Sequence, residues 1–195
     1  MPNYRRRRVP GGTYFFTVNL ADADDCRLCL EVDLFRECYR KTAQELPFRT
    51  DTIVVLPDHL HAIWTLPLGD ADYSERWRRI KQRFCHALHQ KHARSESRLA
   101  EWNPRIWQPR FWEHTIRNAE DLSNHRAYCF HDPVRHDLVH HPRDWALSSF
   151  VKRGSTMPED MVLDAAPTMR FPVGERDEQF SKGGRIPRPT IGAHS

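Results

Sequence analysis

The sequence contains no long hydrophobic run. Among its 195 residues, no apolar stretch approaches the ~18 residues that a membrane-spanning helix needs. The basic residues near the amino terminus run into PGGTYFF, and not into the apolar segment of a signal peptide. We therefore expect a cytoplasmic protein that makes no contact with a membrane.

Cysteine is scarce and lacks the spacing of a metal framework. The five cysteines are an odd number without secretory context, so we expect reduced thiols. Cys26 and Cys29 form a single CxxC with no second pair, which favours a plain loop over a zinc site. The sequence also has no HExxH motif and no P-loop, which argues against a zinc hydrolase and against nucleotide-driven chemistry.

Positive charge is concentrated in two stretches. The formal net charge is only +4, but residues 5–8 are four consecutive arginines, and residues 73–92 carry six Lys or Arg against one Glu. Such clusters favour a polyanionic partner. Solvated helix faces and an unstructured basic amino terminus remain open alternatives for both stretches.

Periodicity predicts seven elements in the order β-α-β-β-α-β-α. The predicted strands cover residues 12–21, 48–57, 59–67 and 107–116, and the predicted helices cover residues 32–46, 73–92 and 118–139. This order is the split βαβ plan of an α+β, ferredoxin-like antiparallel sheet with an extra C-terminal helix. From residue 154 onward Gly, Pro and mixed charges dominate, so we expect a core domain over 1–153 and a poorly ordered tail over 154–195.

Two histidines stand one residue apart in the predicted strand LPDHLHAIWTLP. On a strand, His59 and His61 share one face, where two neutral imidazoles can hold a cation together. With 12 histidines in 195 residues, chance alone gives roughly 0.7 such pairs per chain. Taken alone, the pair therefore fits structural histidines better than a metal site.

A second pattern lies on the last predicted helix. Tyr128 and Asp132 are four residues apart, so they share one helix face. A tyrosine hydroxyl can act as a nucleophile, and a carboxylate can complete a metal site. The spacing does not show whether this helix packs against the strand of His59 and His61, and Tyr128 could equally be a residue at the edge of the core.

The segment WNPRIWQPRFW interleaves tryptophans with arginines. Trp107, Arg110 and Trp112 could bind single-stranded nucleic acid, because aromatic rings stack on bases and guanidinium groups bind phosphates. The alternative is that the tryptophans belong to the core, which we expect for at least one of them.

Four blocks in fixed order resemble the REP-associated tyrosine transposases of the single-tyrosine HUH superfamily. These blocks are PDHLHAIWTLP, DADYSERWRRIKQRF, IWQPRFWEHTIRNAEDL and YCFHDPVRH, and the match runs from about Tyr4 to Phe150. The resemblance implies an HUH transposase-like catalytic domain over 1–153, with the histidines on a central strand and the tyrosine on a C-terminal helix. His59 and His61 then match the histidine pair, and Tyr128 matches the nucleophile.

Asp132 departs from the family pattern. The family helix often reads YIHYNPVKH, with Asn or Gln as third metal ligand four residues after the tyrosine, whereas this sequence reads YCFHDPVRH. A carboxylate is a good ligand for Mg²⁺ or Mn²⁺, so binding can persist. The replacement of a neutral amide by a carboxylate alters the charge beside the DNA phosphate.

The resemblance implies a monomer that nicks and joins single-stranded DNA hairpins, the palindromic REP elements, on bacterial nucleoid DNA. The chemistry would pass through a 5′-phosphotyrosyl intermediate with Mg²⁺ or Mn²⁺ as cofactor. The alternative is a hairpin-binding module that no longer cleaves. Besides Trp107, Arg110 and Trp112, the residues expected to contact the DNA are Arg5, Arg6, Arg7, Arg8, Arg78, Arg79 and Lys81.

Overall fold

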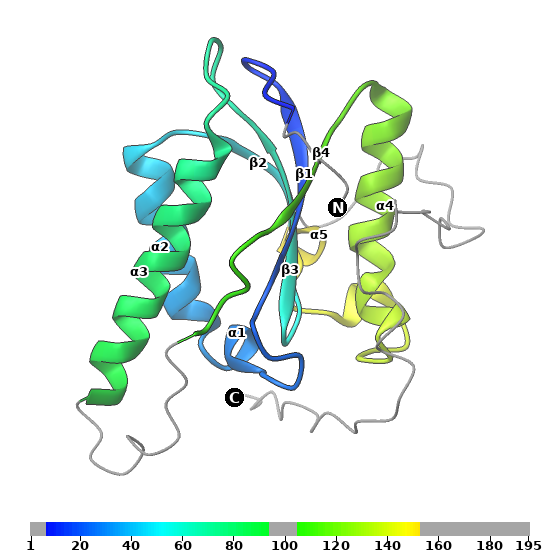
Figure 1. Ribbon diagram of the computed structural model, residues 1–195. Helices are drawn as coiled ribbons and strands as arrows, with labels where there is room; N and C mark the ends of the chain where they lie inside the picture. Colours follow the sequence, from blue (N-terminus) through cyan, green and yellow to red (C-terminus); the bar gives the residue numbers. More distant parts are fainter. Residues whose placement is uncertain (1–6, 94–104, 153–195) are drawn as a thin grey trace, which may run out of the picture.

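The computed structural model describes residues 7–93 and 105–152 (Figure 1). The elements are β1 (Thr13–Asn19), α1 (Arg27–Leu30), α2 (Val32–Glu45), β2 (Arg49–Val55), β3 (His59–Thr65), α3 (Tyr73–Ala93), β4 (Trp112–Thr115), α4 (Ala119–Arg135), the 3₁₀ helix η2 (Pro142–Asp144) and α5 (Ser149–Lys152). No helix within these ranges has the length and apolar character needed to cross a membrane. The tail expected over 154–195 lies outside the described residues.

Four antiparallel strands form one sheet in the order β2-β3-β1-β4. Strand β1, TYFFTVN, consists mainly of β-branched and aromatic residues, and its five middle residues are buried. Strand β3 pairs with β1 along its whole length, from Thr13 opposite Thr65 to Asn19 opposite His59. The α+β, ferredoxin-like fold predicted from the sequence is confirmed, and β3 is an inner strand, as expected.

The two faces of the sheet are covered by different helices (Figure 1). Tyr14, Phe16 and Val18 of β1 pack into a core with α2 and α3. Phe15, which points the other way, packs into a second core with Tyr128 and Cys129 of α4. Alternation along a single strand therefore builds a three-layer arrangement, with α2 and α3 on one side and α4 on the other.

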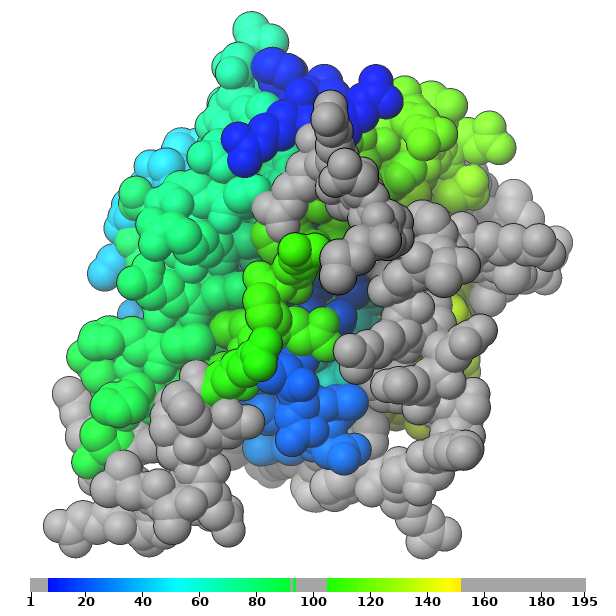
Figure 2. Space-filling model, in the orientation of Figure 1, coloured from blue at the N-terminus to red at the C-terminus, as the bar shows by residue number. Residues whose placement is uncertain are grey.

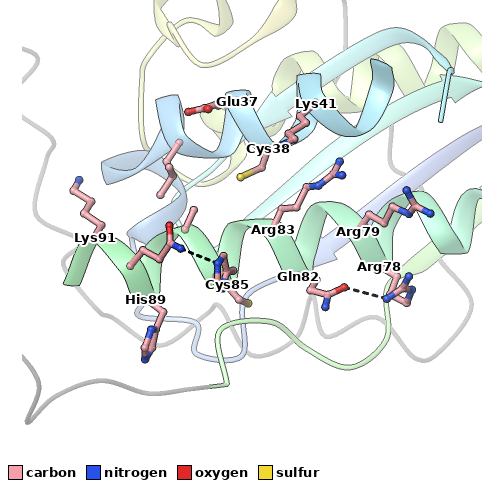
Figure 3. A pocket seen from close by; sticks show the side chains of 14 residues that line it. Glu37, Cys38, Lys41, Arg78, Arg79, Gln82, Arg83, Cys85, His89 and Lys91 are labelled. Carbon is pink, nitrogen blue, oxygen red and sulfur yellow. Dashed lines mark hydrogen bonds between the residues drawn. The ribbon is translucent and has the colours of Figure 1, made fainter. Parts of the chain in front are cut away.

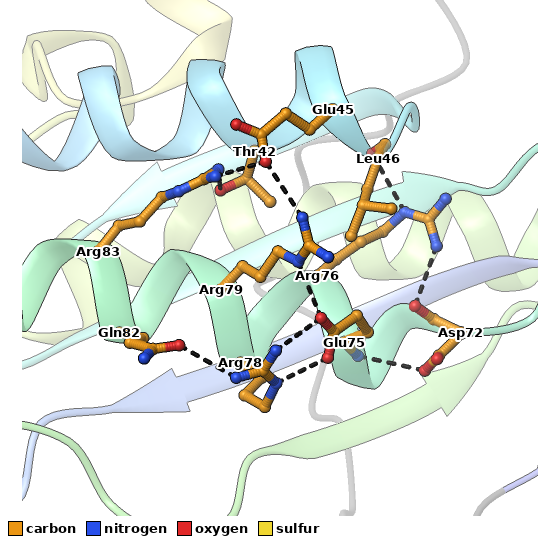
Figure 4. A network of polar contacts seen from close by, with 10 residues as sticks. All are labelled: Thr42, Glu45, Leu46, Asp72, Glu75, Arg76, Arg78, Arg79, Gln82 and Arg83. Carbon is orange, nitrogen blue, oxygen red and sulfur yellow. Dashed lines mark hydrogen bonds and ion pairs between the residues drawn. The ribbon is translucent and has the colours of Figure 1, made fainter.

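A polar network joins α2 to α3 on the outside of the first layer (Figure 4). Arg83 donates to Thr42 and to Glu45, and Arg79 bridges Glu45 and Glu75. Arg76 is buried and donates to backbone carbonyl groups at the end of α2, including that of Leu46 at 3.3 Å. This region of basic residues is thus largely a structural clamp between the two helices.

Helix α4 has well-defined caps at both ends. Asn118 caps its amino end by accepting from the Asp121 backbone N–H at 2.8 Å. At the carboxyl end, Asp137 adopts the left-handed conformation, with φ of 54°. The Leu138 N–H bonds the Pro133 carbonyl and the Asp137 N–H bonds that of Val134, the pattern of a Schellman cap. The helix predicted over 118–139 therefore ends earlier, at Arg135.

The strand predicted over 107–116 is also shorter than expected. The structure has only β4, from Trp112 to Thr115, preceded by an isolated bridge between Leu20 and Trp107. Pro109 lies between these two pairings and has no N–H to donate to a ladder. Figure 2 shows this segment at the surface between α3 and α4. The short elements α1, η2 and α5 were not predicted.

Candidate active site

His59 and His61 project from β3 toward α4. Both side chains are buried, at 6% and 2% exposure, and Leu60 between them packs into the opposite core. Helix α4 carries Asp132 and Tyr128 to the same place, so the structure brings together the four residues that the sequence suggested as one site. The link that spacing alone left open, the packing of α4 on β3, is present.

Both imidazoles face one carboxylate. The Nε2 atoms of His59 and His61 each lie 3.2 Å from Oδ2 of Asp132. The other ring nitrogens are held from behind, His59 Nδ1 by Asp58 at 2.8 Å and His61 Nδ1 by Thr17 at 3.0 Å. Partners of this kind fix the orientation of imidazole ligands and leave the opposite nitrogen free to bind.

The two histidines differ in charge. Burial opposes protonation of His59, but hydrogen bonds to Asp132 and Asp58 outweigh it and raise the pKa of His59 to about 10. Burial lowers the pKa of His61, which keeps that ring neutral at pH 7. Burial also opposes ionisation of Asp132, but its contacts with His61 and His59 lower the Asp132 pKa well below its ordinary value. At pH 7 and without a metal ion, these pKa shifts favour an ion pair between His59 and Asp132 beside a neutral His61.

The site retains two atoms that could bind a metal ion and that make no hydrogen bond. Among the described residues, His61 Nε2 and Asp132 Oδ1 are buried side-chain atoms without a hydrogen-bond partner. His136 lies at the end of α4, with its Nε2 3.7 Å from Asp132 Oδ1, and could join His59 and Asp132 in holding a metal ion. Buried polar atoms without partners are costly, and a cation bound between them would remove that cost.

Tyr128 stands one helical turn before Asp132. Its ring meets that of His61 nearly edge-on, at 5.1 Å between centroids. The Arg135 guanidinium lies over the Tyr128 ring, 4.7 Å from the centroid and 3.6 Å from Asp132 at its nearest nitrogen. Phe15 stacks on His61 at 5.3 Å and meets Tyr128 edge-on at 5.9 Å. The tyrosine ring therefore contacts both a histidine of the site and a cation.

Sequence reasoning missed several of these neighbours. His136 and Arg135 lie four and three residues after Asp132, so the same spacing rule that paired Tyr128 with Asp132 could have found them. Asp58 precedes His59 directly. Thr17 carries no such signal, because its place opposite His61 follows from the register between β1 and β3.

The tryptophans expected to bind DNA point to different layers. Trp112 is half-buried and lies on the α4 side, whereas Trp107 packs into the α2–α3 core at 7% exposure. Arg110 is exposed between them. Arg7 and Arg8 are exposed at the start of the described chain, and Arg5 and Arg6 lie outside the described residues.

Helix α3 lies on the other side of the sheet from α4, the helix that carries Tyr128 (Figure 1). A groove with a volume of about 1130 Å³ between α2 and α3 is lined by Arg78, Arg79 and other basic residues (Figure 3). Both arginines are already paired with Glu75, at 2.7 and 2.8 Å. Lys81 donates to the Gln108 carbonyl at 3.0 Å. This groove belongs to the structural clamp more than to the site on α4.

Comparison with known proteins identifies close relatives. No protein-family model matches the chain. A protein named REP-associated tyrosine transposase, from Escherichia coli strain K12, is 42% identical over 179 residues, which covers 90% of this chain and 98% of the relative. A Haemophilus influenzae protein of the same family name is 39% identical over 163 residues, covering 82% of this chain and 93% of the relative.

A solved structure agrees with these relatives. The structure of a REP-associated tyrosine transposase bound to a REP hairpin matches with a TM-score of 0.74 at 41% identity, covering 90% of this chain and 98% of that chain. The antiparallel ferredoxin-like sheet and this level of identity define a transposase-type α+β protein. The chain belongs to the REP-associated tyrosine transposases, as the four sequence blocks predicted.

Proposed function

We propose that this protein cleaves and rejoins single-stranded DNA at palindromic, REP-type hairpins through a covalent link to Tyr128. The observation that carries the proposal is the meeting of His59, His61 and Asp132 beside Tyr128, from two elements that are far apart in the sequence. The relative that was solved with a REP hairpin supports the substrate class.

We infer that His59, His61 and Asp132 hold a divalent cation, Mg²⁺ or Mn²⁺. The unpartnered His61 Nε2 and Asp132 Oδ1 atoms fit this role, and oxygen and imidazole ligands suit Mn²⁺ in particular. When bound, such a cation supplies Lewis-acid polarisation of the scissile phosphate. Because hydrogen bonds to Asp132 and Asp58 raise the pKa of His59 to about 10, metal binding at pH 7 must displace a proton from its binding nitrogen.

Tyr128 would act as the nucleophile. Its hydroxyl oxygen forms a bond to the scissile phosphorus, and the bond from phosphorus to the 3′-oxygen breaks. The phenol proton leaves, and the released 3′-oxygen takes up a proton to become a free hydroxyl. The phosphodiester energy is kept in the 5′-phosphotyrosyl bond, so a 3′-hydroxyl of the same or another strand can reverse the reaction without ATP.

Arg135 and Phe15 would prepare Tyr128 for this step. The positive charge of Arg135 over the ring favours the phenolate that attack requires. Phe15 contacts both His61 and Tyr128, and thereby fixes the nucleophile relative to the ligand set. Restricting the distance between reacting groups in this way is a major part of the rate gain in such sites.

Trp112 is the best candidate for a base-stacking contact near the site. Thr17 pairs with His61 on one side and with Trp112 on the other, so the three residues form one row across β3, β1 and β4. Two strand spacings place the Trp112 backbone about 10 Å from that of His61, a distance that one or two nucleotides span. Arg110, Arg7 and Arg8 are exposed and could bind phosphates of the DNA backbone. Arg78, Arg79 and Lys81 lie on α3, across the sheet from Tyr128, so they would contact only DNA outside the segment that is cleaved.

A nicking assay with two labels tests the proposal. A hairpin with a single-stranded flank is labelled at its 5′ end or its 3′ end and incubated with the protein and Mn²⁺, with EDTA as control. The 5′-labelled fragment should leave with a free 3′-hydroxyl, and the 3′-labelled fragment should migrate with the protein on a denaturing gel. A hairpin that is bound but never cut, with Mn²⁺ or in a parallel incubation with Mg²⁺, would overturn the proposal and favour the binding module. Action on nucleoid DNA would place the protein in the cytoplasm.

A further inference from the structure

A second cluster of two histidines and one aspartate lies between β4 and α4. His114 Nε2 is 2.9 and 3.2 Å from the two Asp121 carboxylate oxygens, and His125 Nδ1 is 3.1 Å from Oδ1 of the same carboxylate. One ligand atom from each residue lies within 4.8 Å of the others. The two imidazoles stack at 4.6 Å with an angle of 15° between their planes. Two ring nitrogens therefore converge on one carboxylate.

Neighbouring groups hold this cluster in place. The Arg117 backbone N–H donates to Asp121 Oδ2 at 2.9 Å. The indole of Trp112 stacks on His114 at 6.0 Å, and Phe15 packs against His125 at 4.8 Å. A carboxylate and two rings whose positions are fixed before binding lose little entropy when they coordinate an ion.

The cluster is separate from the candidate active site. Asp121 precedes Asp132 by 11 residues on α4, which corresponds to about 16 Å along the helix axis. His114 belongs to β4, whereas His59 and His61 belong to β3, and β1 runs between these strands. The His114 and Asp121 side chains are 23% and 19% exposed, so an ion can reach them from solvent.

We propose that His114, Asp121 and His125 form a second, structural site for a divalent transition metal of the Zn²⁺ type. Two imidazoles and one carboxylate with room for water match the ligand sets that Zn²⁺ and Co²⁺ accept, and they suit Mg²⁺ poorly. The ion would tie β4 to the amino-terminal half of α4, the helix that carries Tyr128. Nothing in this role requires the ion to contact DNA.

One hydrogen bond opposes metal binding. His125 Nδ1 also lies 2.8 Å from the Asp121 backbone carbonyl, which is the geometry of a donated N–H. Ligation therefore requires the tautomer with its proton on Nε2 and the loss of this bond. Burial lowers the pKa of His125 and so keeps the ring neutral, as a ligand must be. Without a metal, the cluster remains a hydrogen-bonded link between the two elements.

Cobalt titration of the tag-free full chain distinguishes a metal site from such a link. Co²⁺ is titrated into wild type and into His59→Asn, a substitution that breaks both candidate ligand sets of the active site. The cluster variant His114→Gln is added in the His59→Asn background, with ligand-field absorption and bound stoichiometry as readouts. The matched control is His86→Gln, which removes an α3 histidine outside both clusters. Circular dichroism verifies that each variant is folded.

The His59→Asn protein should still bind one equivalent of Co²⁺, with nitrogen and oxygen ligands by X-ray absorption. Adding His114→Gln should weaken that equivalent at least ~10-fold, and adding His86→Gln should not. Saturating Zn²⁺ should also raise the melting temperature of His59→Asn by mass action. The proposal is overturned if His59→Asn binds no Co²⁺, if binding survives in the His59→Asn/His114→Gln protein, or if a thiolate band shows that Cys26 and Cys29 are the ligands. Because these readouts need no DNA, they are independent of hairpin cleavage.

Discussion

Asp132 is the residue at which this chain departs from its family. It is fully buried and contacts both His59 and His61, as the proposed role of third metal ligand requires. Asp132→Asn restores a neutral ligand and should keep substantial cleavage, with a changed preference between Mg²⁺ and Mn²⁺. Asp132→Ala removes the ligand, and metal affinity or activity should fall at least ~10–100-fold. Titration of Mn²⁺ against cleavage measures both.

An alternative role for Asp132 predicts a different result. If the carboxylate only stabilises the end of α4 before Pro133, both substitutions change stability and leave the metal dependence alone. Three superimposable Mn²⁺ curves for wild type, Asn and Ala would therefore exclude Asp132 as a ligand.

Trp112 offers a second prediction at the residue scale. Trp112→Ala should weaken binding of the single-stranded flank by ~1–3 kcal/mol, because one stacked base loses its platform. Fluorescence anisotropy with a labelled hairpin measures the affinity. A matched control, Arg36→Ala on the exposed face of α2, should leave it unchanged. Equal affinity of the Trp112 and Arg36 variants would show that the indole is only a core residue.

The candidate site could be predicted in its parts but not in its assembly. Alternation placed His59 and His61 on one face, and helical spacing placed Tyr128 with Asp132. Thr17 was unpredictable because a strand register depends on partners that a local pattern does not contain. Arg78 and Arg79 remain predicted DNA contacts, whereas their ion pairs with Glu75 depend on side-chain positions that composition does not show.

At the scale of elements, α4 is held on the sheet by a buried ion pair. Arg126 donates two hydrogen bonds to Asp51 of β2, at 2.7 and 2.6 Å, and Asp51 is 5% exposed. Arg126→Ala leaves this carboxylate buried without its cation and should cost about 2–3 kcal/mol of unfolding free energy, reduced from the fully buried case because Arg126 is partly exposed. Urea denaturation measures the loss.

The same variant tests how α4 serves catalysis. Loosening the helix should also slow cleavage, since the proposed nucleophile Tyr128 and the proposed ligand Asp132 both depend on its position. For comparison, Arg36→Ala breaks an exposed pair with Asp33 and should change stability by less than ~0.5 kcal/mol. If Arg126→Ala matched that small change, the Asp51 pair would not anchor the helix.

Element prediction succeeded where periodicity was long and failed where a local contact decided the boundary. The two helices on the first face and the three long strands agree with the structure to within a few residues. The end of α4 depends on the left-handed Asp137, a non-glycine residue that gives little signal. Strand β4 is short because Pro109 interrupts the pairing, so the segment predicted as one strand forms only an isolated bridge and a short strand.

At the scale of the whole molecule, the pH dependence of stability should reflect a carboxylate far from the site. Asp70, between β3 and α3, accepts from Arg76 Nη2 at 2.7 Å, and this contact lowers the pKa of Asp70. A lowered folded-state pKa stabilises the protein above the unfolded value of about 3.9. That contribution is lost as pH falls through the folded-state value.

Asp70→Asn should therefore lower stability at pH 7 and have little effect once the pH is below both values. Urea denaturation of wild type and variant across the acid range measures the difference. A difference that stayed constant with pH would show that the Asp70 side chain contributes through packing and not through its charge.

The identity of the nucleophile is the central claim, and a covalent adduct tests it most directly. The protein is incubated with Mn²⁺ and a hairpin, the adduct is digested, and mass spectrometry locates the modified peptide. The account predicts a phosphodeoxynucleotide on Tyr128 alone. It also predicts that Tyr128→Phe forms no adduct but binds the hairpin within ~2-fold of wild type, because affinity resides in stacking and phosphate contacts. An adduct on another tyrosine such as Tyr73, or one that persists in Tyr128→Phe, would contradict it.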